Sequence, residues 1–536
     1  MTGASAPGDD GLAGDAPGGV QGSPLAAALF DMDGVVTDTA DAHAAAWKRL
    51  FDEFLRQRSQ RTGEEFHPFD IERDYRMYVD GKSRYDGVAS FLGARGIELP
   101  RGDPADEPRQ VTVCGLGNRK NDYFREWLDE HRVEAYPATR ALIERLRRAG
   151  VAVGIFSASR NARAVLASAG VEGLFDAHVD GVDVDRLGLA GKPDPAILLE
   201  AAGRLDCEPA RTAVIEDAVA GVRAGARGGF QPVIGVNRGD YREALADAGA
   251  AIVVEDVGEL ALMPDGRIAR RRLDALPSAR DRRGELADRL AERQPAVFLD
   301  YDGTLTPIVE DPAAADLDTA TRETLRALAA RFPVSVISGR SLADLRARVG
   351  LDGLVYAGSH GFEIAGPGFE HTPAAARAFL PALEQAEAEL REGLAGIEGH
   401  LVERKPFAIA VHYRRVASDR VGDVERAVDR VLGDHPRLRK GRGKKVLQLQ
   451  PRLAWDKGRA VAWLLQRLGL VRDDVVPVYI GDDLTDEDAF RALAGRGITL
   501  ALRDGDRATA ADYALADPGE VRWFLRALAA SDGLAA

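Results

Sequence analysis

Two short motifs rich in aspartate carry the clearest chemical signal in the sequence. Each reads Asp-X-Asp-Gly after an apolar run: Asp31 and Asp33 follow LAAALF, and Asp300 and Asp302 follow AVFL. Paired carboxylates at a strand end repel each other unless a cation neutralises them, and hard oxygen ligands favour magnesium. We therefore expect Mg²⁺ at both motifs. Asp31 and Asp300 are the predicted nucleophiles that form an aspartyl-phosphate, and Asp33 and Asp302 the predicted general acid/base groups.

Three further elements follow each motif in the same order: a strand that ends in Ser, a Lys beside Gly, and a strand that ends in acids. The lysines and serines would hold the nucleophile and the phosphoryl oxygens as charge redistributes, and the acids would complete the metal shell. A lone Asp-X-Asp-Gly is usually a turn, but four elements in order and in duplicate favour catalysis. The catalytic residues are thus Asp31, Asp33, Ser157 and Lys192, then Asp300, Asp302, Ser338 and Lys457; the metal ligands are Asp31, Asp33, Glu216 and Asp217, then Asp300, Asp302, Asp482 and Asp483.

Strands that alternate with helices predict the α/β class, here two doubly wound parallel-sheet, Rossmann-like cores whose ligands bind at the carboxyl ends of the strands. The spacing from Lys to the second acid cluster is equal in the two halves, but the other spacings differ, so each half carries a large insertion at a different point. The first insertion, about 40–132, reads as a helical cap. The second, about 361–447, mixes helical and alternating segments and reads as an α+β cap.

These patterns divide the chain into four parts. Residues 1–24 contain little that could be buried and read as a disordered leader, and 25–257 form the first domain. Residues 258–290 are rich in Arg, Asp and Leu and read as a partly helical, solvated linker, and 291–536 form the second domain.

Composition narrows the possible partners. The net charge of −14 disfavours nucleic acid and anionic membranes, so an anionic ligand needs a local basic pocket. Two cysteines exclude a disulfide framework and suit a reducing cytoplasm. We find no membrane-spanning run and no signal peptide, so we expect a soluble, cytoplasmic protein that binds small molecules. The oligomeric state stays open.

The four elements resemble the signature motifs of the haloacid dehalogenase-like superfamily, from about Leu25 to Trp523, and the two insertions resemble its two cap types. The second half is similar to trehalose-6-phosphate phosphatases through DYDGTLTPIV, SGR, GSHGFEI, ERKPFAIAVHYR and GDDLTDEDAF. This resemblance implies hydrolysis of trehalose 6-phosphate to trehalose and phosphate. It also implies that the cap binds the distal glucose and that the substrate-binding residues are Arg340, His360, Glu403, Lys405, Lys444 and Gln448.

Two of these residues leave alternatives open. His360 either contacts the substrate or shapes the hinge of the cap. Family members usually carry Glu where this chain has Gln448, so an amide replaces one sugar-binding carboxylate.

The first half resembles β-phosphoglucomutases and closely related hydrolases through DMDGVVTDTADAHAAAWK, SRYDGV, GNRKND, SASRN and GKPDP. In that family a bisphosphate intermediate is retained while the sugar reorients, so β-glucose 1-phosphate becomes glucose 6-phosphate. The resemblance implies that sugar phosphates are held by His43, Arg84, Lys120, Ser159 and Asn161. The preferred prediction is a bifunctional enzyme. The alternative is a broader sugar-phosphate phosphatase whose first half only binds a sugar phosphate.

Overall fold

A computed structural model describes residues 24–530 except 72, 240, 310–313, 444 and 454. The expected leader, 1–24, lies outside the described residues apart from Pro24. The chain divides into two compact units. Unit 1 holds residues up to 136, 143–255 and 262–269, and unit 2 holds 137–142, 256–261 and the residues from 270 onward. Within the described residues no helix is long and apolar enough to cross a membrane.

The core of unit 1 is a six-stranded parallel sheet in the order β3-β2-β1-β4-β5-β6. Its strands are β1 (Ala27–Asp31), β2 (Ala152–Phe156), β3 (Ala177–Val179), β4 (Thr212–Glu216), β5 (Val233–Val236) and β6 (Ile252–Val254). The helices along this part of the chain are α4 (Pro137–Arg148), α5 (Ala162–Ser168), α6 (Gly181–Leu187), α7 (Ala196–Arg204), α8 (Val219–Arg227) and α9 (Arg242–Asp247). Strand β1 is buried along its whole length, which explains its unbroken apolar sequence.

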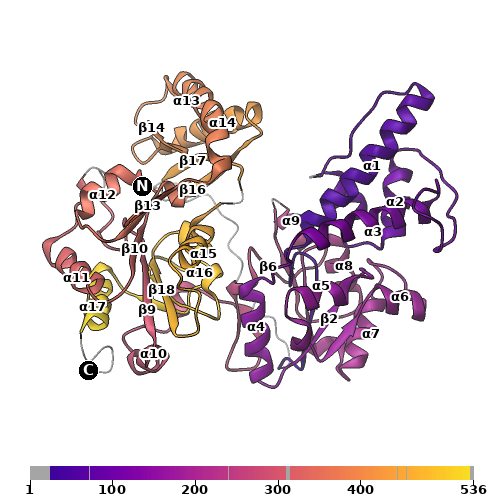
Figure 1. The fold of residues 1–536 in the computed structure, drawn as a ribbon, viewed down its shortest axis with the longest axis horizontal. Coiled ribbons are helices and arrows are strands. Elements are labelled where there is room, and N and C mark those ends of the chain that lie inside the picture. The colour runs from indigo at the N-terminus through magenta and orange to yellow at the C-terminus, as the bar shows by residue number, and fades with distance from the viewer. Residues whose placement is uncertain are drawn as a thin grey trace, which may run out of the picture. The chain divides into compact units, whose positions relative to one another are not determined.

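A helical cap lies between β1 and β2 in the sequence. It consists of α1 (Ala40–Thr62), a π-helical turn η1 (Tyr75–Val79), α2 (Arg84–Ala94) and α3 (Val113–Glu130). Figure 1 shows α1, α2 and α3 grouped apart from the sheet of unit 1. Their apolar faces form a separate core around Trp47, Phe51 and Phe91.

The core of unit 2 is an eight-stranded sheet in the order β13-β12-β11-β10-β9-β18-β19-β20. Its strands are β9 (Gln294–Leu299), β10 (Val334–Ile337), β11 (Val355–Gly358), β12 (Glu363–Gly366), β13 (Phe369–His371), β18 (Val475–Gly481), β19 (Ile498–Leu502) and β20 (Tyr513–Leu515). Val297 and Leu299 of β9 pack into one hydrophobic cluster and Ala296 and Phe298 into another, so both faces of this central strand are buried. The helices are α10 (Arg283–Leu290), α11 (Thr319–Ala329), α12 (Leu342–Val349), α15 (Lys457–Arg467), α16 (Glu487–Leu493) and α17 (Pro518–Ala529).

The cap of unit 2 is an antiparallel sheet with two helices, seen in orange in Figure 1. Its strands, in the order β14-β15-β17-β16, are β14 (Leu401–Lys405), β15 (Ala408–His412), β16 (Leu438–Gly443) and β17 (Val446–Pro451), and its helices are α13 (Leu380–Leu394) and α14 (Val421–Asp434). The predicted α/β class, with two doubly wound cores, a helical first cap and an α+β second cap, is confirmed.

Two boundaries differ from the sequence prediction. The hairpin β12–β13 was assigned to the second cap, but it extends the core sheet because Ile364 packs into the core against β11. The segment 258–290 was expected to be a partly helical, solvated linker; it does contain α10, but it is not solvated throughout. Instead Leu273, Leu276 and Leu286 are buried in the clusters of unit 2, while the arginines between them lie at more exposed positions.

Candidate functional site

In unit 2 the predicted catalytic residues come together at the carboxyl ends of neighbouring parallel strands. Asp300 follows β9, Ser338 follows β10 and Asp482 follows β18, and β9 pairs with both of the others. Parallel strands end at the same edge of a sheet, so this topology alone brings the three side chains together. Ser338 is buried, and its hydroxyl oxygen accepts a hydrogen bond from the backbone N–H of Arg340 at 3.1 Å.

Lys457, the first residue of α15, reaches into this group. Its Nζ donates to Asp300 at 2.7 Å and to Asp486 at 2.6 Å, and Asp486 also accepts from the Tyr479 hydroxyl at 2.7 Å. Burial alone would lower the pKa of Lys457, but the two carboxylates outweigh it and hold that pKa well above its usual value. The lysine is therefore a fixed cation beside the predicted nucleophile.

Three buried carboxylates, of Asp300, Asp482 and Asp486, have oxygens within 4.8 Å of one another. Burial, followed by the neighbouring carboxylates Asp486 and Asp482, raises the pKa of Asp300 well above its usual range although Lys457 opposes the shift. Lys457 supplies one positive charge to these three buried carboxylates, so a further cation would stabilise their charged form, and carboxylate oxygens are the ligands that a divalent cation prefers. The residues present thus fit a bound metal ion.

Sequence reasoning missed Asp486 and chose Asp483 instead. Asp483 is only half-buried, and its carboxylate accepts from the backbone N–H of Leu484 at 2.7 Å, where it caps a short 3-10 turn. Asp486 has no exposed surface. The spacing Asp-X-X-Asp at 483–486 is the signal that could have found it, because this spacing forms a capping box and turns the second acid back toward the strand end.

The glycine that closes each motif is required by geometry. Gly303 has φ +87°, and a Cβ atom there would overlap the carboxylate of Asp482. Gly34 in unit 1 has φ +80°, and a Cβ atom would overlap Asp217 in the same way. Glycine permits both the left-handed backbone and the close approach of the third carboxylate.

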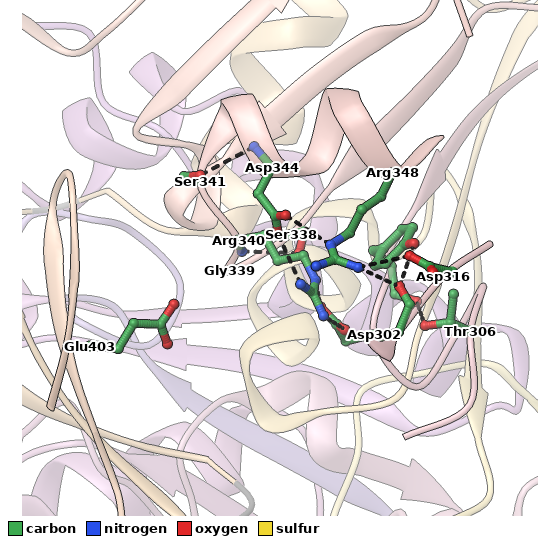
Figure 2. A network of polar contacts seen from close by, with 12 residues as sticks. Asp302, Thr306, Asp316, Ser338, Gly339, Arg340, Ser341, Asp344, Arg348 and Glu403 are labelled. Carbon is green, nitrogen blue, oxygen red and sulfur yellow. Dashed lines mark hydrogen bonds and ion pairs between the residues drawn. The ribbon is translucent and has the colours of Figure 1, made fainter. Parts of the chain in front are cut away.

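Arg340 binds the predicted acid/base group of unit 2 directly (Figure 2). Its Nε and Nη2 donate to the two oxygens of Asp302 at 2.7 and 2.6 Å, and its Nη1 donates to Asp344 at 2.8 Å. Arg348 donates to the other oxygen of Asp344 at 2.9 Å and to Asp316 at 3.0 Å. Arg340 was expected to bind substrate; the structure places it as the clamp on Asp302 within a chain of alternating charges.

The cap of unit 2 places its predicted sugar ligands near this core. Lys405 donates from Nζ to the backbone carbonyl of Gly339 at 2.9 Å, and His360 Nε2 lies 3.1 Å from Gln448 Oε1. Glu403 faces the Arg340 network in Figure 2 and pairs with His412 at 2.9 Å, which holds the pKa of Glu403 below its usual value. Lys444, the remaining predicted ligand, lies outside the described residues.

The centre of unit 1 repeats this arrangement. Lys192 Nζ donates to Asp31 at 2.6 Å and to Glu216 at 2.9 Å. Asp31, Glu216 and Asp217 form the second cluster of buried carboxylates that fits a metal ion. Ser157 is buried, and its oxygen accepts from the backbone N–H of Ser159 at 3.0 Å, as Ser338 does from Arg340 in unit 2.

The cap of unit 1 contributes a basic pair to the same pocket. His43 Nε2 lies 3.4 Å from Asp33 Oδ1, and Lys120 Nζ lies 2.6 Å from His43 Nδ1. Burial lowers the pKa of Lys120 to about 7. Arg84 also lines the pocket, and Asn161 donates to Asn121 at 2.8 Å. Sequence reasoning thus selected cap residues that the structure brings together with Asp33.

Asp80 is a further pocket residue that sequence reasoning missed. It follows η1 of the cap and lines the same pocket as Asp31 and Lys192. Burial, followed by the charge of Asp31, raises the pKa of Asp80 to about 6. The sequence gives little signal for it, since Asp80 precedes a glycine and such a pair is typical of an ordinary turn.

Comparison with known proteins gives a separate result for each half. A trehalose-phosphatase family model matches residues 298–519, and a haloacid dehalogenase-like hydrolase model matches 25–229. A trehalose-phosphate phosphatase of Mycobacterium leprae is 42% identical over 408 residues, which cover 73% of this chain and 92% of that protein. Its namesake in Mycobacterium tuberculosis is 43% identical over 397 residues, which cover 73% of this chain and 91% of that protein.

A longer relative covers almost the whole chain. A Mycobacterium tuberculosis protein named as an uncharacterized glycosyl hydrolase is 44% identical over 510 residues, or 94% of this chain, and the chain spans only 38% of its length. Among solved structures, the Candida albicans trehalose-6-phosphate phosphatase C-terminal domain matches with 25% identity over 47% of this chain and 98% of that one, at a TM-score of 0.42. A β-phosphoglucomutase from Clostridium difficile matches with 27% identity over 44% and 92%, at a TM-score of 0.35.

Proposed function

Because this chain belongs to the trehalose-phosphate phosphatase family, we propose that unit 2 hydrolyses trehalose 6-phosphate to trehalose and phosphate. The observation that carries the proposal is a buried group of Lys457 and three carboxylates that fit a cation, those of Asp300, Asp482 and Asp486. Cap residues Glu403 and Lys405 lie beside this group. Magnesium is the proposed ion, held by Asp300, Asp482 and Asp486. When bound, it would neutralise the carboxylates and the phosphoryl charge.

The residues of unit 2 suit a two-step transfer. A carboxylate oxygen of Asp300 attacks phosphorus, the bond from phosphorus to the sugar oxygen breaks, and Asp302 gives its proton to that oxygen. Asp302 then takes a proton from water as the water oxygen attacks phosphorus, and the bond to Asp300 breaks to release phosphate. Lys457 and Ser338 hold the phosphoryl oxygens, while Arg340 orients Asp302.

For unit 1 we propose a phosphotransferase that converts β-glucose 1-phosphate to glucose 6-phosphate. The contacts that run from Lys120 to His43 and from His43 to Asp33 support this proposal, because they join the cap to the acid/base group. In the proposed transfer Asp31 carries the phosphoryl group and Asp33 moves the proton, while Lys120 and Arg84 hold the sugar phosphate. Its ligands would be small sugar phosphates, and we propose that the enzyme acts in the cytoplasm, which the presence of only two cysteines favours.

The test measures phosphate release from trehalose 6-phosphate by the full chain with magnesium. Asp300→Asn should abolish release, and the matched Asp31→Asn should preserve it. Equal rates on trehalose 6-phosphate, glucose 6-phosphate and sucrose 6-phosphate would favour a broader phosphatase. Conversion of β-glucose 1-phosphate that survives Asp300→Asn and is lost in Asp31→Asn would support the function of unit 1; no transfer from any sugar phosphate would contradict it.

A further inference from the structure

A small group of polar side chains joins the cap of unit 2 to its core. His360 lies on the turn after β11, and Gln448 lies on cap strand β17. Gln448 Oε1 lies 3.1 Å from His360 Nε2 and also accepts a hydrogen bond from Gln450 Nε2 at 2.6 Å. An amide oxygen can only accept, so the proton of the imidazole belongs on Nε2.

The other imidazole nitrogen has no partner among the described residues. His360 Nδ1 is buried and makes no hydrogen bond in the part of the chain that the structure describes. A neutral imidazole protonated at Nε2 carries a lone pair on Nδ1, and a buried acceptor left unpaired costs free energy. Among the described residues this acceptor is therefore left unused.

The charged groups around His360 also favour the neutral ring. Lys457 faces it from α15, Lys405 from β14 and Arg439 from β16, and all three are cations. Burial, followed by these cations, holds the pKa of His360 well below its usual value. The hydrogen bond to Gln448 on β17 acts in the opposite direction and raises the pKa of His360, but it does not outweigh burial and the cations.

The ring lies beside the predicted phosphoryl and sugar ligands. A Cβ atom on Gly339 would come within 2.7 Å of His360 Cε1, and the carbonyl of Gly339 accepts from Lys405. The backbone N–H of His360 donates to the carbonyl of Ser338 at 2.9 Å. Ser359 and His360 both have left-handed backbones, with φ +50° and +57°, which is uncommon for residues other than glycine and typical of functional sites.

We propose that Gln448 fixes His360 as the Nε2–H tautomer, so that Nδ1 accepts a hydrogen bond from one hydroxyl group of the sugar phosphate. This inference rests on the function proposed for unit 2, and the contact from His360 Nδ1 to the hydroxyl would help unit 2 to select its substrate. A glutamate at 448 would stabilise the imidazolium instead, and both ring nitrogens would then donate. The amide therefore sets which kind of hydrogen bond the site offers to the sugar.

The tautomer is tested on the full chain with ¹⁵N-labelled histidine. The His360 signals, assigned by their loss in His360→Phe, should show one protonated nitrogen and one unprotonated nitrogen between pH 6 and 8. Gln448→Glu should convert both to protonated nitrogens at pH 6. A wild-type ring protonated at Nδ1, or an unchanged spectrum in Gln448→Glu, would overturn the proposal. This measurement needs no turnover, so it is decided separately from the phosphatase activity.

The hydroxyl contact is tested with monodeoxy analogues of trehalose 6-phosphate. His360→Phe should raise KM for the full substrate about threefold to tenfold, the range of one neutral hydrogen bond. For the analogue that lacks the contacting hydroxyl, KM with wild type should be higher than KM for the full substrate by the same factor. His360→Phe should raise the KM of that analogue no further. His435→Phe, on a cap histidine that pairs with Glu389, is the matched control and should leave KM unchanged. Additive losses for every analogue would refute the contact, whereas absence of hydrolysis by wild type would refute the proposed function itself.

Discussion

Glu216 and Asp486 bind the active-site lysine of their own unit from different positions in the chain. Glu216 is the last residue of β4, directly before the cluster aspartate Asp217, and it accepts from Lys192 at 2.9 Å. Asp486 lies four residues after the cluster aspartate Asp482, and it accepts from Lys457 at 2.6 Å. The two units thus reach one charge arrangement by different local structures.

Asp486 should therefore stabilise unit 2 strongly. Asp486→Asn leaves Lys457 with one fewer charged partner and turns an N–H₂ group toward donors, so the free energy of unfolding should fall by about 3–5 kcal/mol. Asp483→Asn keeps the cap of the turn and should cost far less. Urea unfolding of the two variants gives the comparison. A larger loss of unfolding free energy in Asp483→Asn than in Asp486→Asn would instead favour Asp483, the residue chosen from the sequence.

The clamp on Asp302 predicts a loss in rate rather than in binding. Arg340→Lys replaces two parallel hydrogen bonds by one point charge, so kcat for trehalose 6-phosphate should fall by up to about 100-fold. Arg348 contacts Asp344 rather than Asp302, so Arg348→Lys should have only a small effect on kcat. A rise in KM with unchanged kcat would instead make Arg340 a substrate ligand.

The glycine of the second motif gives a prediction with a close control. Gly303→Ala forces a Cβ atom into the carboxylate of Asp482, so hydrolysis of trehalose 6-phosphate should be lost. Gly368→Ala also occupies a left-handed position, with φ +78°, but its Cβ atom would meet nothing within 4 Å. It should cost only about 1 kcal/mol of stability and preserve activity. Equal activity of the two variants would show that the close approach to Asp482 is dispensable.

The sequence predicted the cores and caps well because their signals are local or repeated. Buried strands such as β1 and β9 read as apolar runs, and the order of Asp, Ser, Lys and acids fixes which strand ends converge. Side-chain pairing was harder. The assignments of Arg340 to the substrate and of Asp483 to the metal stay predictions, since a sequence shows neither the contact of Arg340 with Asp302 nor the turn that brings Asp486 inward.

Metal removal should affect activity and stability together. EDTA should abolish hydrolysis of trehalose 6-phosphate and lower the melting temperature, because buried Asp300, Asp482 and Asp486 then repel one another. Magnesium at about 100 times its Kd should restore roughly 2.7 kcal/mol of stability to the unit that binds it. In Asp482→Ala the activity should stay lost at every magnesium concentration. Full activity in EDTA would contradict a metal at this site.

Lys120 should destabilise unit 1 at neutral pH. Its pKa is lowered to about 7 in the folded chain by burial, and in the unfolded chain it returns to the ordinary, higher lysine value. Between these two values the unfolded state binds more protons, so the free energy of unfolding must rise with pH above about 7, by at most about 1.4 kcal/mol per pH unit. Lys120→Met removes the titratable amine. It should flatten the rise of the unfolding free energy with pH and stabilise unit 1 at pH 7.

Pulse proteolysis at pH 7, 8 and 9 can measure this effect, because fragment size separates the unfolding of the two units. Inorganic phosphate should also flatten the rise in wild type, since an anion in the pocket favours the charged form of Lys120. An equal rise in wild type and Lys120→Met would assign the pH dependence to other groups. The expected result would mean that charging Lys120 in this buried pocket costs free energy of folding and that a bound phosphate reduces this cost.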